Sequence, residues 1–216
     1  NLKGRECYGG LDLASVRDIA ALVFNFPNEE TGVNDIYCKF YCPAEMIHQR
    51  RQKNENHNYA VWEKQGWLTT TPGNAIDFNF IKKDIHEIGG EVVIKAIAFD
   101  RWNASQIVQD LMSDGLEMAP FGQGFASMST PTKALEKMVL EKNINHGGNP
   151  ILAWMINNTQ TVEDPAGNIK PAKNKSKGKI DGVIALVESI GEQITRQNDK
   201  PKKNKYNDPN SQLLIL

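Results

Sequence analysis

Three aspartates stand at the ends of apolar segments, where an ionised carboxylate is costly to bury. Asp12 lies in the apolar run 7–14, Asp100 ends the run 92–99, and Asp181 opens an apolar stretch near the C-terminus. Burial of a carboxylate costs several kcal/mol unless a cation or hydrogen-bond donors meet it. Carboxylate oxygens are the ligands that Mg²⁺ and Mn²⁺ prefer, so three such acids that converge would form a divalent-metal site.

Each aspartate also has a purely structural explanation. Asp12 can turn to solvent at a strand end, and Asp100 can cap the helix that follows it. Asp181, taken alone, is better explained as a first-turn carboxylate favoured by the helix dipole. These explanations need three separate coincidences, whereas one site accounts for all three acids. Two metal ions about 4 Å apart in such a site can activate a water and stabilise the leaving oxygen of a phosphodiester.

The segments that would carry these acids predict a mixed α/β sheet. Residues 6–14 and 18–26 are apolar runs joined by Ser15-Val16-Arg17, a short connection typical of an antiparallel hairpin. Alternating polarity over 35–41 predicts a third strand, which Pro43 ends. Later strands are expected at 67–71, 92–100 and 116–120, reached by helical crossovers.

Helical segments complete the predicted fold. They are expected at 44–65 with a break near Asn56, 77–88, 105–113, 130–142 with Pro131 in the first turn, 149–157 and 181–193. Residues 159–179 are expected to form a loop or weak hairpin. The fold class is therefore α/β, a mixed sheet in which the first three strands are antiparallel, the later ones parallel, and helices flank the sheet. We expect one domain over 1–195 and a flexible C-terminal tail over 196–216.

The bulk composition fits one large domain. The chain has 216 residues and a net charge of −1, and its apolar and charged fractions, 40% and 24%, are ordinary for a globular protein. It has no apolar run of membrane-spanning length, and its start does not resemble a signal peptide. Cys7, Cys38 and Cys42 lack the partners of a zinc site, so we interpret them as reduced residues of an intracellular protein. Because the chain begins with Asn1 and not Met, we interpret it as a piece of a longer protein.

A basic segment precedes Asp181. It contains no acid over ten residues and holds Lys170, Lys173, Lys175, Lys177 and Lys179. Lys173, Lys175 and Lys177 are candidates to hold a DNA strand through its phosphates, with a solvated loop as the equal alternative. The lysines after residue 199 fit a disordered tail.

A few further residues are secondary candidates. Asp18 can approach the metal site, although a turn residue explains it as well, and His146 can position water or phosphate, although a lone loop histidine is more often incidental. Gln123 and Gly124 can bring a backbone amide to a phosphate. Trp102 and Trp154 are expected in the core.

Five short motifs occur in an order that is similar to a known family. They are Gly9-Gly10-Leu11-Asp12-Leu13-Ala14-Ser15, Ala98-Phe99-Asp100-Arg101-Trp102, Phe121-Gly122-Gln123-Gly124, Asn145-His146-Gly147-Gly148-Asn149-Pro150 and Lys179-Ile180-Asp181-Gly182-Val183-Ile184-Ala185-Leu186. Together they resemble the C-terminal nuclease domain of tailed-phage large terminase subunits, within the RNase H-like superfamily. The resemblance covers nearly all the chain up to about residue 195.

This resemblance implies a metal-dependent endonuclease that cuts double-stranded concatemeric DNA during genome packaging. Asp12, Asp100 and Asp181 would hold two Mg²⁺ or Mn²⁺ ions, although many RNase H-like enzymes have a longer Glu where this chain has Asp100. The full-length protein would carry an N-terminal ATPase motor and work with a small terminase subunit and the portal or prohead, in the host cell cytoplasm and away from membranes. The sequence has no G-x-x-x-x-G-K-[ST] phosphate loop, so the chain itself would cut but not translocate DNA.

Three other functions fit parts of the sequence. Residues 10–15 also resemble the first phosphate hairpin of actin-like and sugar-kinase ATPases, which need a second glycine-rich hairpin and a longer, two-lobed chain. A non-catalytic DNA-binding packaging module would not need all three acids. A resolvase of related fold would prefer branched over linear duplex DNA.

Overall fold

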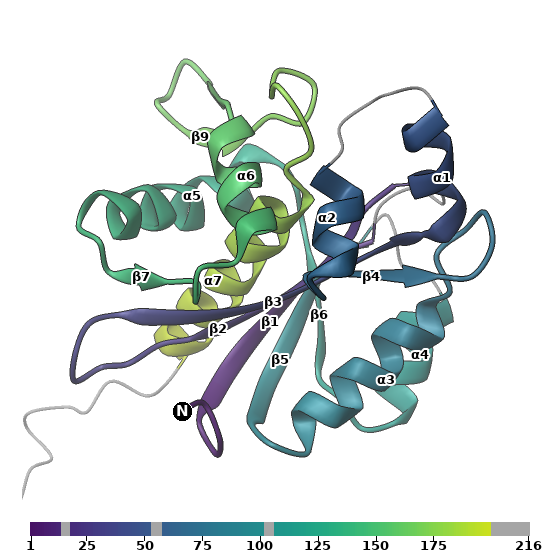
Figure 1. The fold of residues 1–216 in the computed structure, drawn as a ribbon. Coiled ribbons are helices and arrows are strands. Elements are labelled where there is room, and N and C mark those ends of the chain that lie inside the picture. The colour runs from purple at the N-terminus through teal and green to yellow at the C-terminus, as the bar shows by residue number, and fades with distance from the viewer. Residues whose placement is uncertain (14–17, 53–57, 102–105, 200–216) are drawn as a thin grey trace, which may run out of the picture.

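A central mixed sheet with helices on both faces makes up the computed structural model, which describes residues 1–13, 18–52, 58–101 and 106–199 (Figure 1). Within these residues the sheet has seven strands in the order β4-β3-β2-β1-β5-β6, with β7 paired to β3 off this path. The strands are β1 (Glu6–Asp12), β2 (Ala20–Phe26), β3 (Asn34–Pro43), β4 (Leu68–Thr71), β5 (Val93–Asp100), β6 (Met118–Phe121) and β7 (Ile144–Asn145).

The pairing pattern confirms the predicted fold class. β2 is antiparallel to both β1 and β3, whereas β5 is parallel to β1 and to β6, and β4 is parallel to β3. The expected connection at 15–17, the break near Asn56, Trp102 and the chain after residue 199 lie outside the described residues.

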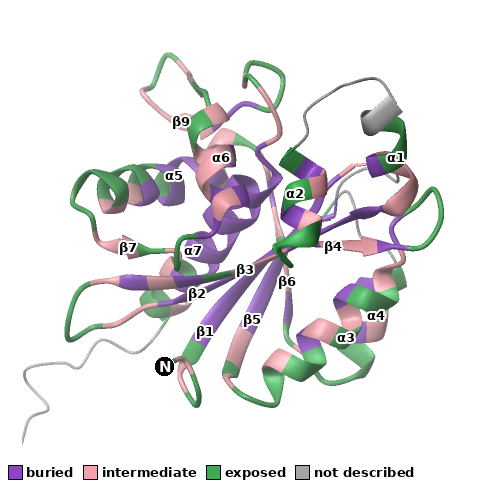
Figure 2. Ribbon diagram, viewed as in Figure 1, coloured by how far each residue is buried: buried purple, intermediate pink, exposed green. Residues whose placement is uncertain are grey.

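Both faces of the sheet are covered, which is why β2 is buried at every position. One apolar cluster joins the sheet to α1 (Ala44–Gln52), α2 (Asn58–Lys64), α5 (Phe125–Leu140), α6 (Pro150–Asn158) and α7 (Asp181–Asp199). A second cluster joins the opposite face to α3 (Phe78–Gly89) and α4 (Gln106–Ser113). Figure 2 shows the buried strands between the two layers of helices. Within the described residues, no helix combines the length and apolarity that a membrane crossing requires.

Two helix boundaries differ from the sequence-based prediction. α5 begins at Phe125, one turn earlier than expected, so Pro131 lies inside the helix, where a Cβ added at Gly191 of α7 would lie 3.4 Å from its ring. Packing against α7 therefore accompanies a proline inside a helix, a position that the helix propensity of proline alone would not predict. α7 continues to Asp199, past the predicted helix end at 193. Residues 159–179, expected as a loop or weak hairpin, contain the hairpin β8 (Thr161–Glu163) with β9 (Ile169–Pro171).

α7 packs closely against β1. All residues from Asp181 to Gln193 are buried. A Cβ added at Gly10 of β1 would lie 1.8 Å from the carbonyl oxygen of Ala185, and one added at Gly182 would lie 2.7 Å from the ring of Phe40. Glycine therefore lets the backbones of helix and strand come into direct contact, and this contact fixes where the first turns of α7 lie over the sheet.

We predict that Gly10→Ala destabilises the protein by about 3 kcal/mol or more, because the added methyl overlaps backbone that cannot rotate away. Urea unfolding followed by circular dichroism measures the change. Gly89→Ala is the matched control, since its added methyl meets Ile94 at an ordinary 3.5 Å and a helical position favours alanine. Equal stability of the Gly10→Ala variant and the wild type would show that the helix can shift off the strand.

Candidate metal centre

Asp12 and Asp100 end two neighbouring parallel strands. Leu11 of β1 pairs with Phe99 of β5, so the next residues, Asp12 and Asp100, reach the same level of the sheet. Leu11 and Phe99 pack in the apolar cluster with α3 and α4. Because side chains alternate along a strand, both aspartates face the opposite side, where α7 lies. They are nearly excluded from solvent, with 1% of Asp12 and 9% of Asp100 exposed.

Asp181 approaches the same place from the first turn of α7. The contact between Gly10 and Ala185 lies one helical turn further along that helix. The ammonium of Lys173, on the loop after β9, bridges the two elements: its Nζ lies 2.6 Å from Asp12 Oδ2 and 3.1 Å from Asp181 Oδ1. A single cation therefore already joins the carboxylate of β1 to that of α7.

The electrostatics of Asp12 reflect this crowding. Burial raises the pKa of Asp12 to about 6, against the opposing charge of Lys173 and with the help of the neighbouring charges of Asp181 and Asp100. Burial acts to lower the pKa of Lys173, but the charges of Asp12 and Asp181 outweigh it and hold that pKa above its ordinary value. One ammonium is thus strongly held and still does not fully compensate the carboxylates around it.

Glu188, which the sequence analysis did not single out, belongs to the same cluster. It lies seven residues after Asp181 on α7, is fully buried, and accepts a hydrogen bond of 3.1 Å from Gln123 Nε2. Burial raises the pKa of Glu188 well above its ordinary value, and the charges of Asp12 and Asp100 add to this effect. The available signal was an acid two turns from Asp181 within an otherwise apolar helix stripe.

The donor set fits a hard divalent cation. Among the described residues, Asp12 Oδ1, Asp181 Oδ2 and Glu188 Oε2 are buried carboxylate oxygens without a hydrogen-bond partner. In the same part of the chain, no three His, Cys, Asp or Glu side chains are arranged as ready ligands of one ion. Lys173 lies between Asp12 and Asp181, so a cation bound by both would take the place of its ammonium.

The other candidate residues from the sequence lie at different places relative to this cluster. Lys175 and Lys177 are exposed on the loop that carries Lys173. Asp18 forms an ion pair with Lys179, two residues before Asp181, so it borders the cluster through that lysine. Gln123 contributes through its side chain, and Gly124 is the N-cap of α5.

His146 lies at the other end of the sheet, away from the acidic cluster. Its neighbour Asn145 pairs with Asp35, and Asp35 pairs with Phe26. Asp12 pairs with Ala21, five residues away along β2, which is about 17 Å of strand. His146 instead lines a cleft of about 380 Å³ beside β3. The parallel pairing of β7 with β3 places His146 beside this cleft. A two-residue strand is too short to be predicted from the sequence.

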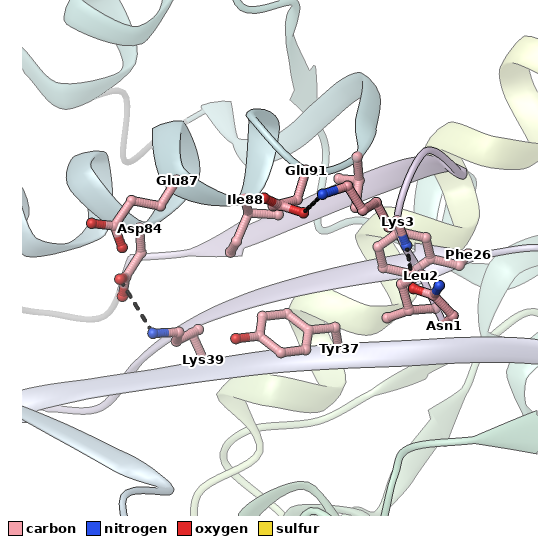
Figure 3. A pocket seen from close by; sticks show the side chains of 11 residues that line it. Asn1, Leu2, Lys3, Phe26, Tyr37, Lys39, Asp84, Glu87, Ile88 and Glu91 are labelled. Carbon is pink, nitrogen blue, oxygen red and sulfur yellow. Dashed lines mark hydrogen bonds and ion pairs between the residues drawn. The ribbon is translucent and has the colours of Figure 1, made fainter.

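A second cavity is also separate from the acids. It has a volume of about 390 Å³ and lies between α3 and the sheet, on the face opposite α7. Figure 3 shows the ion pairs at its rim, Lys39 with Asp84 and Lys3 with Glu91. Trp154 packs beside Tyr59 and Trp62, with ring centroids 6.2 and 5.3 Å away, as expected for a core residue.

Known proteins resemble this chain over most of its length. The large terminase subunit of Enterobacteria phage HK97 is 38% identical over 189 residues, which are 87% of this chain and 37% of the relative. Protein YmfN of Escherichia coli K12 is 27% identical over 198 residues, covering 88% of this chain and 43% of that protein. The chain therefore spans about two fifths of the length of these curated relatives.

Solved structures show the same likeness. The crystal structure of the HK97 large terminase matches with a TM-score of 0.81 and 36% identity, over 89% of this chain and 40% of that one. The large terminase nuclease of thermophilic phage G20c, solved with bound magnesium, matches with a TM-score of 0.54 and 13% identity, over 88% and 84% of the two chains. This second likeness shows a common fold.

The family described as the endonuclease domain of the terminase large subunit matches residues 1–197, which include every strand and nearly all of α7. The chain belongs to this family of terminase large-subunit endonuclease domains and is an endonuclease.

Proposed function

We propose that this endonuclease hydrolyses phosphodiester bonds of double-stranded concatemeric phage DNA during packaging, with two divalent cations as cofactors. The observation that carries the proposal is the buried pair Asp12 and Asp181, joined by one ammonium, with Asp100 beside Asp12 in strand register. Structures of the G20c large terminase nuclease with bound magnesium and with bound cobalt support divalent-cation use. Mg²⁺ or Mn²⁺ suits the oxygen donors of this chain.

Asp12, Asp100 and Asp181 are the proposed metal ligands and catalytic residues. When bound, the cations would supply an activated water and stabilise the leaving oxygen of the phosphodiester. Asp12 would hold the cations together with Asp181, which lies across the Lys173 bridge, and Asp100, which lies on the adjacent strand. The rigid sheet and the packed helix fix these side chains before substrate arrives, which is the preorganisation that such a site requires.

Lys173 has two positions in this proposal. Without a cation its ammonium neutralises part of the charge on Asp12 and Asp181. Its side chain is 44% exposed, so once a cation binds, the ammonium can turn outward to a DNA phosphate. Lys175 and Lys177 on the same exposed loop would contact further phosphates and add affinity without sequence preference.

The longer relatives set the cellular context of the proposal. The chain corresponds to 37% of the HK97 large terminase subunit, so we place it in a longer protein with an N-terminal ATPase motor. That protein would act in the host cell cytoplasm with the small terminase subunit and the portal or prohead. The motor would move the DNA and this domain would cut it.

The first test is cleavage of linear plasmid DNA with Mn²⁺ or Mg²⁺. Asp12→Asn and Asp181→Asn should each lower the cleavage rate by more than about a hundredfold, since even groups that only support a metal ligand cost about 10- to 100-fold. Asp114→Asn is the control, because Asp114 pairs with Lys82 and His86 on the other face of the sheet. Cleavage that survives the first two changes, or that requires branched DNA, would contradict the proposal.

The second test is the competition between Lys173 and the cation. Lys173→Met keeps the apolar stem but removes the ammonium, so the metal-free protein should unfold at a lower temperature than the wild type. Added Mn²⁺ should then raise the unfolding temperature of this variant more than that of the wild type, because no ammonium has to leave. Lys175→Met serves as the control on the same loop, and an identical Mn²⁺ response of all three proteins would argue against competition.

The third test is the pH dependence of metal-free stability. Because the pKa of Asp12 rises from 3.8 to about 6 on folding, the folded state binds the proton more tightly than the unfolded state. The contribution of protonated Asp12 is therefore fully present below its unfolded pKa and is lost as the pH rises through about 6. The difference in unfolding free energy between the wild type and Asp12→Asn should fall over this range in urea titrations without metal. A pH-independent difference would mean that Lys173 fully compensates the charge.

A further inference from the structure

Glu188 reaches the acidic cluster from deeper inside the protein than Asp181 does. The two acids are seven residues apart on α7, which places them on one helix face and about 10 Å apart along its axis. Between them, Ala185 contacts Gly10 of β1. Glu188 therefore lies over the inner part of the sheet beneath the level of Asp12, on the side where Gln123 follows β6.

The surroundings of Glu188 satisfy only half of its carboxylate. Oε1 accepts a hydrogen bond from Gln123, whereas Oε2 is buried without a partner. The like charges of Asp12 and Asp100 act on it, opposed by the ammonium of Lys173. A glutamine would keep the bond from Gln123 and add a donor toward those acids, so the metal-free fold alone would be better served by Gln than by Glu.

We propose that Glu188 is a fourth carboxylate of the cation site and supplies Oε2 to the divalent ion held on the Asp100 side of Asp12. This inference rests on the proposed function. Gln123 is then a positioning residue, because its amide holds Oε1 and leaves Oε2 without a partner. With Asp12, Asp100 and Asp181, the four carboxylates balance the charge of two divalent cations.

The test compares Mn²⁺ binding by calorimetry with thermal unfolding in the absence of metal, for the wild type, Asp12→Asn, Glu188→Gln and Glu192→Gln. Glu188→Gln should weaken Mn²⁺ binding at least about tenfold. Loss of a group that only supports a metal ligand lowers metal affinity about 10- to 100-fold, and loss of a ligand should lower it at least as much. The same change should raise the metal-free unfolding temperature, since it removes an uncompensated buried charge. A purely structural glutamate would show the opposite change in stability and no change in Mn²⁺ affinity.

Glu192→Gln is the matched control. Glu192 lies one turn further along the same helix, is 6% exposed, and pairs with Arg196 at 2.6 Å, away from the cluster. Its loss should lower metal-free stability and leave Mn²⁺ affinity within about twofold of the wild type, which is the scatter expected for a distant site.

The outcomes separate the two proposals. If wild type and Asp12→Asn bind Mn²⁺ equally, the proposed function fails. If Asp12→Asn loses binding but Glu188→Gln binds as the wild type does, only the role of Glu188 is overturned. Should circular dichroism show that Glu188→Gln does not fold, Gln123→Met carries the test: weaker Mn²⁺ binding supports the positioning role, and unchanged binding overturns the inference.

Discussion

Like charge buried in one place is the constraint on which the rest of this structure depends. Asp12, Asp181 and Glu188 are all shielded from water, Asp100 is nearly so, and Lys173 is the ammonium that contacts two of them. Repulsion between carboxylates grows as the dielectric falls, so this cluster opposes folding wherever it lacks a matching cation. The raised pKa of Asp12 and of Glu188 expresses that cost. The arrangement of the domain therefore depends on a positive charge that offsets the repulsion between these carboxylates.

The cluster is held together by backbone packing and not by flexible loops. Parallel register between β1 and β5 sets Asp12 beside Asp100, and strand alternation turns both toward α7. Gly10 then lets the helix backbone rest on β1, which brings the first turn of α7 over the strand end. Gly182 and Gly191 allow the same close approach to Phe40 and Phe121. Acids that repel one another are thus kept together by contacts elsewhere along the same elements.

Sequence reasoning succeeded where burial and periodicity carried the information. The antiparallel opening of the sheet, the helix from Asp181 and the convergence of Asp12 with Asp181 follow from charged residues at the ends of apolar runs. It could not place His146 relative to the acids, because the pairing of the two-residue strand β7 with β3 decides which end of the sheet the histidine occupies. Pro131 was misplaced because packing against α7 overrides its preference for a first turn. Glu188 was passed over because a single acid in a helix stripe shows its neighbours only after folding.

The hairpin β8–β9 connects the loop that carries Lys173 to the buried part of the site. Lys170 of β9 donates to the carbonyl of Gln123 at 2.9 Å and lies 5.3 Å from the ring centre of Phe125. The side chain of the same Gln123 holds Glu188. Lys173 follows only three residues after Lys170, so its reach toward Asp12 is set by that anchor. Gln123 therefore contacts both the hairpin that leads to Lys173 and the inner acid Glu188. A displacement of the hairpin would act on the ammonium of Lys173 and on the carboxylate of Glu188.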